Sequence, residues 1–259
     1  MNIYKAYAKV NIFLKITGTR GDYHEIISRF MKVPTLYDEL SFAPKTDETF
    51  QIIGDFNCTT EQNTIYKAYL ALYETTQSEA LTQLLRDNAI HVNKIIPSFA
   101  GLGGGSSDAA TFLKMCNEVL NLGLSKSELA IIGAKVGADV PFFLYDYESA
   151  NVSGIGEIVE KFDEEPLELK IVTPKIEIST PHVYQTYREF YFDPLENSQA
   201  ELLKQMRSLE VLKKFSIEEA NDLYKPALHN YPSLKENQKD GYFFSGSGSS
   251  FFTLKGNNG

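Results

Sequence analysis

The stretch from residue 97 to residue 110 constrains this chain more than any other part of its sequence. It reads Pro-Ser-Phe-Ala-Gly-Leu-Gly-Gly-Gly-Ser-Ser-Asp-Ala-Ala, with four glycines within five positions. Glycine permits a positive φ and lets backbone N–H groups approach a ligand with no Cβ in the way. A helix predicted directly after the glycines would point its positive N-terminal end at the same place. The pattern predicts a loop that binds a small anion, and phosphate is the simplest candidate.

The segments on either side support this interpretation. Residues 89–96 have the apolar pattern of a strand, and Pro97 follows them. The helix after the loop carries an apolar face formed by Ala109, Leu113, Cys116 and Leu120. A glycine run is often a flexible linker, but a linker rarely joins a strand to an amphipathic helix within a few residues. The strand, loop and helix together therefore favour a phosphate loop.

Two common phosphate loops do not fit this one. A Walker A loop needs a lysine after its last glycine, and none is present here. A dinucleotide-binding loop needs a third glycine at its sixth position and an acidic residue about twenty positions later. This chain has Ser106 and Asn121 at those places, which disfavours that class.

Composition excludes several classes of function. The net charge of −9 argues against a nucleic-acid-binding groove, and no apolar run approaches the length of a membrane span. We therefore expect no nucleic-acid partner and no membrane contact. Two cysteines, Cys58 and Cys116, indicate buried thiols in a reducing cytoplasm rather than disulfides. The four scattered histidines show no ligand spacing, so we expect no metal site built from protein side chains.

The glycine stretch resembles the central motif of the GHMP small-molecule kinases, and three other segments match the same family. Residues 8–16 with 21–26 resemble its N-terminal signature, 137–143 resemble its Gly-Ala-Asp-Val-Pro-Phe-Phe segment, and 244–251 resemble its last glycine motif. The motifs occur in the family's order. This chain departs from the family in having Gly21-Asp22 in reversed order and Ser98-Phe99 where smaller residues are usual.

The resemblance implies an α+β fold of two domains. Residues 1–160 would form an ATP-binding domain of the ribosomal protein S5 domain 2 type, and 161–259 a ferredoxin-like domain that completes the substrate site. Strands are expected near 3–17, 27–44, 49–53, 89–96, 149–160, 167–172, 241–245 and 250–254. Helices are expected near 63–75, 78–87, 106–121, 126–136, 181–191, 198–214 and 216–230. The acidic residues 163–166 are expected to form a connection.

The resemblance also implies a chemistry. The chain would use ATP with Mg²⁺ to phosphorylate a hydroxyl group of a small cytidine diphosphate substrate in non-mevalonate isoprenoid synthesis, as a cytoplasmic monomer or weak homodimer. Two alternatives remain open at this point. The chain could be another GHMP kinase with a smaller acceptor, such as homoserine, or a nucleotide-binding module without catalysis.

Residues at matching motif positions take the family's roles. Asp139 is expected to act as the base for the acceptor hydroxyl, with Lys9 as the catalytic cation beside it. Asp108 is expected to point away from the phosphates. The expected ATP-binding residues are Asn63, Lys94, Pro97, Gly101, Gly103, Gly104, Gly105, Ser106 and Ser107. The expected substrate-binding residues are Asn11, Tyr23, His24, Phe30 and Tyr184.

Overall fold

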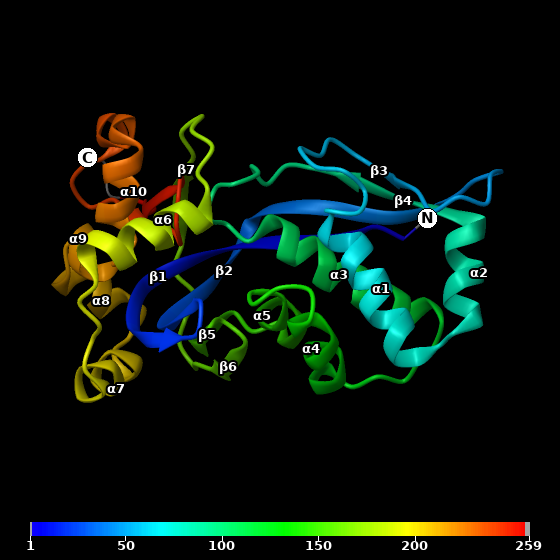
Figure 1. Ribbon diagram of the computed structural model, residues 1–259, viewed down its shortest axis with the longest axis horizontal. Coiled ribbons are helices and arrows are strands. Elements are labelled where there is room, and N and C mark those ends of the chain that lie inside the picture. The colour runs from blue at the N-terminus through cyan, green and yellow to red at the C-terminus, as the bar shows by residue number, and fades with distance from the viewer. Residues whose placement is uncertain (1, 257–259) are drawn as a thin grey trace. The chain divides into compact units, whose positions relative to one another are not determined.

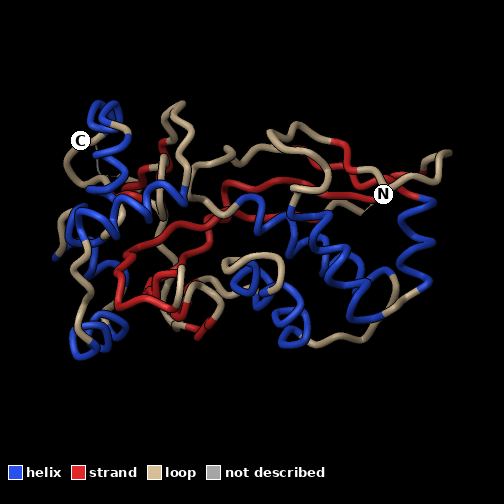
Figure 2. The backbone as a smooth tube through the Cα atoms, in the orientation of Figure 1, coloured by secondary structure: helices blue, strands red, loops and turns tan. Residues whose placement is uncertain are grey.

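Two long strands open the chain in the computed structural model, which describes residues 2–256. Strand β1 (Tyr4–Arg20) and strand β2 (Tyr23–Pro44) pair with each other through a two-residue turn at Gly21 and Asp22. Gly21 has a φ of 60°, the pattern of a type II′ hairpin turn with glycine at its first central position. The reversed Gly21-Asp22 order thus places glycine where this turn requires it. The mixed α+β class expected from the sequence is confirmed (Figures 1 and 2).

The chain forms two compact units that are each discontinuous in sequence. The first unit contains residues 2–8, Pro34–Ile96 and Gly103–Asp146. The second contains Lys9–Val33, Pro97–Leu102 and residues 147–256. The glycine stretch is therefore divided between the units after Leu102. The division of the chain into domains of residues 1–160 and 161–259 stays a prediction.

The first unit combines helices with the second half of β2. Strand β2 pairs antiparallel with β4, with Phe42 opposite Ile90, and β4 pairs in parallel with β3. Phe112 of α3 contacts Phe42 edge to face, so this helix packs on the strand. Helices α1, α3, α4 and α5 pack against one another (Figure 1). The remaining elements here are β3 (Ile52–Ile53), α1 (Thr64–Thr76), α2 (Glu79–Asp87), β4 (Asn88–Asn93), α3 (Gly104–Val119), α4 (Lys126–Ala134) and α5 (Val140–Tyr145).

The second unit contains a hairpin on the first half of β2 and a separate three-stranded sheet. Strand β5 pairs with β2, with Phe30 opposite Ala150, and then with β6, while the separate sheet has the order β7-β9-β8. Its elements are β5 (Ser149–Gly154), β6 (Ile158–Lys161), β7 (Leu169–Val172), α6 (Thr180–Thr186), a π-helical turn (Tyr187–Tyr191), α7 (Asn197–Gln205), α8 (Ser208–Lys214), α9 (Ile217–Ala220), α10 (Tyr224–Asn230), a 3₁₀ turn (Pro232–Asn237), β8 (Phe243–Phe244) and β9 (Phe251–Leu254).

Two helices expected in the second unit are each broken in two. Met206 is extended, and Arg207 starts α8 by donating its backbone N–H to Glu210. Asn221 is also extended, between α9 and α10, because its side chain donates to the carbonyl oxygens of Phe244 and Gly246. The contacts of Asn221 are long-range and leave no periodic signal in the sequence.

Residues 163–166, expected to form a connection, contain a buried anchor. The side chain of Glu164 is 4% exposed and pairs with that of Arg29, which is fully buried. Glu164 also accepts from the backbone N–H of Ser208 at 2.8 Å and thereby caps α8. Arg29 lies 3.3 Å above the ring of Phe162 and donates to the carbonyl oxygen of Lys204. The acidic run is therefore an interior contact at Glu164.

The two cysteines differ in burial. Cys116 is buried as expected, and burial raises the pKa of its thiol well above the usual range, whereas the expectation was wrong for Cys58, which is exposed. Cys58 lies in an irregular segment between β3 and α1, where no strand or helix face covers it.

Among residues 2–256, no helix is long and apolar enough to cross a membrane.

Candidate functional site

The glycine stretch ends in an uncapped helix N-terminus within the first unit. Gly103 precedes α3 with a left-handed φ of 72°, and it has no side chain with which to cap the helix. The first bond of the helix runs from the Ser107 N–H to the Gly103 carbonyl oxygen at 2.8 Å. The N–H groups of residues 103–106 therefore have no partner within the helix. Such an array binds an anion without any basic side chain.

Glycine at positions 104 and 105 is also required by packing. A Cβ on Gly104 would lie 3.0 Å from Cγ2 of Ile96, and one on Gly105 would lie 3.3 Å from Oγ1 of Thr64. The Thr64 hydroxyl donates to the carbonyl oxygen of Gly105 at 2.6 Å, which fixes the start of α1 against the loop. The sequence interpretation missed Thr64, because a lone threonine at a helix start indicates only a cap.

The other expected ATP-binding residues differ in their exposure to solvent. Asn63 is buried and caps α1 by accepting from the Ile65 N–H at 2.9 Å. Ser107 is also buried. Ser106 is half-buried and Gly105 is exposed, so these two are the more accessible members of the loop. Pro97 is exposed and belongs to the second unit.

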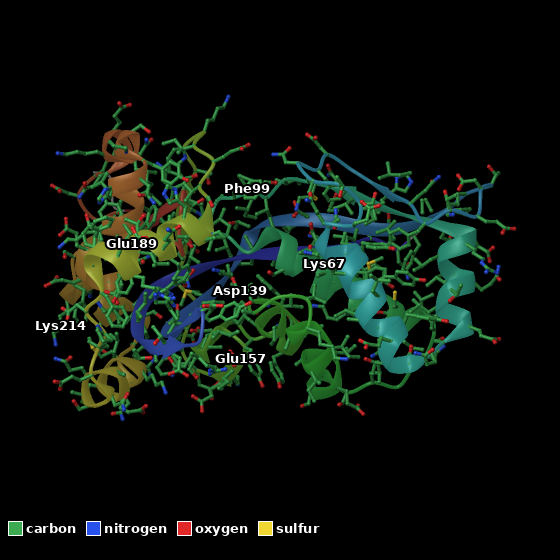
Figure 3. The ribbon with its side chains drawn as sticks, in the orientation of Figure 1. Lys67, Phe99, Asp139, Glu157, Glu189 and Lys214 are labelled. Carbon is green, nitrogen blue, oxygen red and sulfur yellow. The ribbon has the colours of Figure 1, made fainter. Side chains whose placement is uncertain are left out.

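Asp139 lies directly before α5, which is also in the first unit (Figure 3). Its side chain is half-buried and does not cap the helix. Gly137, two residues earlier, lies against the glycine stretch, because a Cβ there would be 3.9 Å from Oγ of Ser106. The expected base is thus carried by a segment in contact with the expected phosphate loop.

Lys9 belongs to the second unit and is held on several sides. Its side chain is almost fully buried, and its ammonium donates to Oδ1 of Asn11 at 2.7 Å and to the carbonyl oxygen of Gly101 at 3.3 Å. The same ammonium lies 4.4 Å from the ring centre of Phe30. Phe30 is only 1% exposed, so its ring supports Lys9. The structure therefore brings together three expected residues, Lys9, Asn11 and Phe30, with Gly101.

Ser245 connects these groups to the last glycine motif. Its hydroxyl accepts from the Asn11 N–H at 3.3 Å and donates to the Gly101 carbonyl oxygen at 2.9 Å. A Cβ on Gly101 would lie 2.1 Å from the Ser245 carbonyl oxygen, so only glycine fits there. Asn221 holds the same turn by donating to the carbonyl oxygens of Phe244 and Gly246, each at 2.9 Å. The motif at 244–251 was the available signal for Ser245, while Asn221 had none.

His24 forms an aromatic cluster in the second unit. Its ring stacks on Tyr184 at 5.2 Å and meets Tyr187 edge to face at 5.7 Å. Burial, with a smaller effect of Arg188, lowers the pKa of His24, which favours the neutral ring. Its Nε2 atom is buried and has no hydrogen-bond partner among the described residues. Tyr23, by contrast, is 64% exposed.

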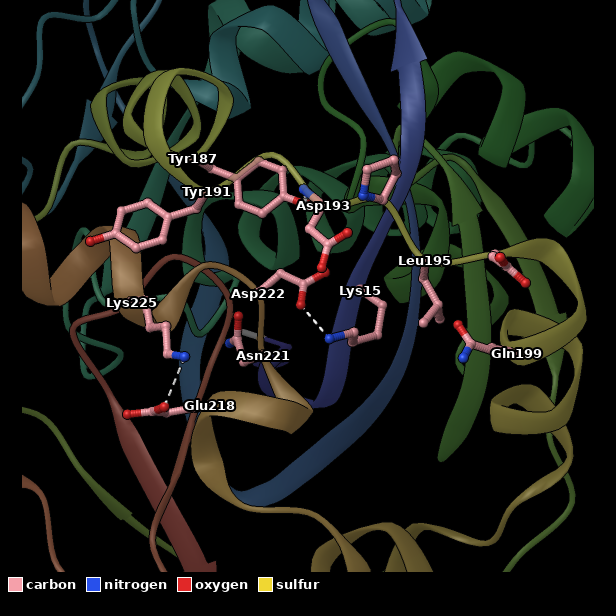
Figure 4. A pocket seen from close by; sticks show the side chains of 12 residues that line it. Lys15, Tyr187, Tyr191, Asp193, Leu195, Gln199, Glu218, Asn221, Asp222 and Lys225 are labelled. Carbon is pink, nitrogen blue, oxygen red and sulfur yellow. Dashed lines mark hydrogen bonds and ion pairs between the residues drawn. The ribbon is translucent and has the colours of Figure 1, made fainter.

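A pocket of about 550 Å³ adjoins this cluster and shares Tyr187 with it (Figure 4). Two lysines line the pocket, and each has an acidic partner. Lys15 pairs with Asp222, and Lys225 pairs with Glu218 at 3.0 Å. Because these cations are already neutralised, the pocket is a poorer site for phosphate groups than the start of α3.

Comparison with known proteins decides the family. A protein of Sulfurimonas denitrificans named 4-diphosphocytidyl-2-C-methyl-D-erythritol kinase is 61% identical to this chain, over 98% of the chain and 97% of the relative. The chain belongs to the 4-diphosphocytidyl-2-C-methyl-D-erythritol kinase family. Members from Campylobacter jejuni and Helicobacter pylori are 43% and 41% identical, over 96% and 98% of this chain and 99% and 94% of their own lengths. It is a small-molecule kinase, and residues 63–147 match the GHMP kinase N-terminal domain.

Solved structures agree with this family. A crystal structure of 4-(cytidine 5'-diphospho)-2C-methyl-D-erythritol kinase has a TM-score of 0.72 and 29% identity, covering 98% of this chain and 90% of that one. A mevalonate kinase from Methanococcus jannaschii has a TM-score of 0.58 at 15% identity, over 98% of this chain and 90% of its own. The second likeness shows the shared GHMP fold, and the expected fold class is confirmed.

Proposed function

We propose that this chain transfers the γ-phosphoryl group of ATP to the 2-hydroxyl group of 4-diphosphocytidyl-2-C-methyl-D-erythritol, giving the 2-phosphate and ADP. The observation that carries the proposal is the 61% identity, over nearly the whole chain, to a kinase of that name. The enzyme would act in the cytoplasm as a monomer or weak homodimer, in non-mevalonate isoprenoid synthesis. Residues 1–160 would bind ATP, and residues 161–259 would complete the acceptor site.

In this proposal the N-terminus of α3 binds the ATP phosphates. The uncapped N–H groups of residues 103–106 support this role, because phosphate oxygens are strong acceptors and the helix dipole favours negative charge. Pro97, Gly101 and Ser107 would shape the loop, and Asn63 would hold the start of α1 beside it. Lys94, directly after β4, belongs to the same region.

Mg²⁺ would neutralise charge on the phosphates. The described residues contain no group of three His, Cys, Asp or Glu side chains arranged to hold a metal ion. This fits Mg²⁺ in a kinase, where the substrate phosphates and water supply most ligands and the protein supplies one or two oxygens. Ser106, the half-buried hydroxyl of the loop, is the protein oxygen we assign to it.

Transfer needs an acceptor for the hydroxyl proton and a positive charge near the phosphoryl group. Asp139 would take the proton from the 2-hydroxyl group, and Lys9 would stabilise the charge that develops during transfer. The support for Lys9 is its fixed ammonium, bonded to Asn11 and Gly101 and backed by Phe30. A cation already in place pays no reorganisation cost during the reaction.

The cytosine of the acceptor would bind at the His24 cluster. A buried polar atom without a partner is costly unless a ligand satisfies it, and Nε2 of His24 is such an atom. A hydrogen bond from this atom to the cytosine edge would remove that cost. Tyr184 and the exposed Tyr23 would flank the base, since aromatic rings stack readily on bases.

The experiment is an ADP-release assay with three acceptors: the cytidyl substrate, homoserine and mevalonate. We expect release with the first only, and inhibition of it by CDP. Release with homoserine and no inhibition by CDP would assign the chain to a different acceptor. Nucleotide binding without release for any acceptor would support the non-catalytic alternative.

A further inference from the structure

Lys94 stands between two carboxylates in the first unit. Its ammonium bonds to Oδ2 of Asp38 in β2 and, at 2.7 Å, to Oδ2 of Asp108 in α3. The three side chains are 10%, 0% and 3% exposed, in the order Lys94, Asp38, Asp108. We call this group the Asp38–Lys94–Asp108 clamp. Two of the three N–H donors of the ammonium are used inside it.

The clamp joins the end of β4 to the start of α3. Oδ1 of Asp38 accepts from the backbone N–H groups of Ile95 and Ile96, the latter at 2.8 Å, and so fixes the chain as it leaves the strand. A Cβ on Gly104 would lie 3.6 Å from the Lys94 ammonium, so the cation is close to the first residue of the helix. The clamp therefore holds the residues on both sides of the anion-binding N–H groups.

Asp108 shows that the clamp is not built for local stability alone. Its Oδ1 atom is buried and has no hydrogen-bond partner among the described residues. Burial raises the pKa of Asp108 to about 7, with Lys94 opposing and Asp38 adding to the shift. For Lys94, burial disfavours the charge, but Asp108 and Asp38 outweigh it and raise the pKa, so the ammonium stays charged. A buried, incompletely satisfied ionic group is costly, and such costs are typical of functional sites.

We propose that Lys94 is a positioning residue whose ammonium, held by Asp38 and Asp108, orients the phosphate-binding N-terminus of α3 and does not itself bind the nucleotide. This inference rests on the proposed function, since it needs ATP at that helix end. It differs from a direct contact in one measurable way. A positioning lysine acts through its carboxylates, so its effect depends on whether they are present.

The test is a double-mutant cycle on Lys94→Met and Asp108→Asn, read as the dissociation constant for ADP and the KM for ATP. Coupled residues deviate from additivity by factors of several-fold to a hundredfold. We expect Lys94→Met to weaken ADP binding about tenfold alone but less than about threefold in the Asp108→Asn background. Equal fold-losses in the two backgrounds would overturn the proposal in favour of direct contact.

The KM and kcat values separate positioning from general destabilisation. The clamp acts on ATP binding, so Lys94→Met should raise the KM for ATP and leave kcat at saturating ATP within about twofold. Lowered kcat with unchanged KM would contradict the proposal. If Lys94→Met does not fold, Lys94→Gln takes its place in the same cycle, because its shorter, neutral side chain removes the ammonium but stays polar beside the two carboxylates.

A matched control is Lys135→Met in the same unit. Lys135 is 49% exposed and pairs with Glu74, which is 73% exposed, so its loss should leave ADP binding unchanged. Failure of the unaltered protein to bind ADP would count against the proposed function itself. Binding of ADP with an additive cycle would count against the positioning role alone.

Discussion

The Lys9 ammonium donates a 2.7 Å hydrogen bond to the side-chain oxygen of Asn11. The two residues are two positions apart in β1, so their side chains lie on the same face of the strand. Asn11 is held in turn by Ser28, whose hydroxyl accepts from Nδ2 of Asn11 at 2.9 Å. Because side chains alternate between the two faces of a strand, the Lys9 ammonium points to the same side of β1 as Asn11.

Replacing Lys9 by methionine tests its catalytic role. Methionine fills similar space in a nearly fully buried position, so the fold should be kept. We expect kcat to fall about 10²–10³-fold, the usual effect of losing one preorganised group that stabilises transition-state charge. Lys170→Met, an exposed change on β7, is the matched control. Unchanged kcat with a lower melting temperature would show that Lys9 is structural.

Ser245→Ala tests the connection between Lys9 and the last glycine motif. The change leaves the buried Asn11 N–H and the Gly101 carbonyl oxygen without the hydroxyl they share. We expect the free energy of unfolding to fall by about 1–3 kcal/mol. Urea denaturation measures this value, and Ser198→Ala, on an exposed position of α7, should change it little. Equal effects of the two changes would mean that the Ser245 contacts carry no net stability.

Glu164→Gln tests the buried ion pair with Arg29. Burial lowers the pKa of Arg29 to about 10, and Glu164 opposes the shift, so the carboxylate offsets part of the cost of burying this guanidinium. Removing one charge of a buried pair costs about 3–5 kcal/mol. Asp163→Asn, in the exposed neighbouring pair with Lys161, is the control and should cost less than about 1 kcal/mol. Similar losses at positions 163 and 164 would contradict the interior role of Glu164.

The pKa of Asp108 predicts how stability depends on pH. Burial raises this pKa from its ordinary value of 3.8 to about 7. Between these values the folded chain keeps a proton that the unfolded chain has lost. The stability contributed by this group is therefore complete below about pH 4 and is lost as pH rises through about 7.

Asp108→Asn should remove this dependence, because asparagine does not titrate. The unfolding free energy of the unaltered chain should decline with pH more steeply than that of the variant, by up to about 1.4 kcal/mol per pH unit between pH 4 and 7. Urea denaturation at pH 5, 6, 7 and 8 gives both curves. Parallel curves would contradict the raised pKa.

Local pattern predicted most of the first unit. The glycine stretch, the strand before it and the helix after it are short-range features, and α1, α2, α3 and α4 fall close to their expected ranges. The six-residue helix α5 was missed, because Gly137 and Pro141 interrupt any helical period there. Of the strand expected near 49–53, only Ile52 and Ile53 form a strand, β3, which pairs with β4.

The second unit was harder, because long-range polar contacts decide its breaks. Asn221 ends one helix by bonding to Phe244 and Gly246, and Glu164 starts another by bonding to Ser208. Neither partner is near in sequence, so no window of residues contains the signal. Motif resemblance selected Lys9, Asn11 and Phe30 as separate site residues, but their mutual contacts became visible only in the folded chain. For Ser245, the motif at 244–251 indicated the segment but not its contact with Asn11.

The most direct test of the account is the identity of the product. The protein is incubated with ATP, Mg²⁺ and 4-diphosphocytidyl-2-C-methyl-D-erythritol, and the reaction is followed by ³¹P NMR. We predict a new phosphomonoester signal, formed together with ADP, without three-bond coupling to hydrogen, because the carbon at position 2 carries none. Asp139→Asn should slow its formation about 10²–10⁴-fold, as for loss of a general base, while ADP binding stays within about twofold. No phosphomonoester, or one formed equally fast by Asp139→Asn, would contradict the account.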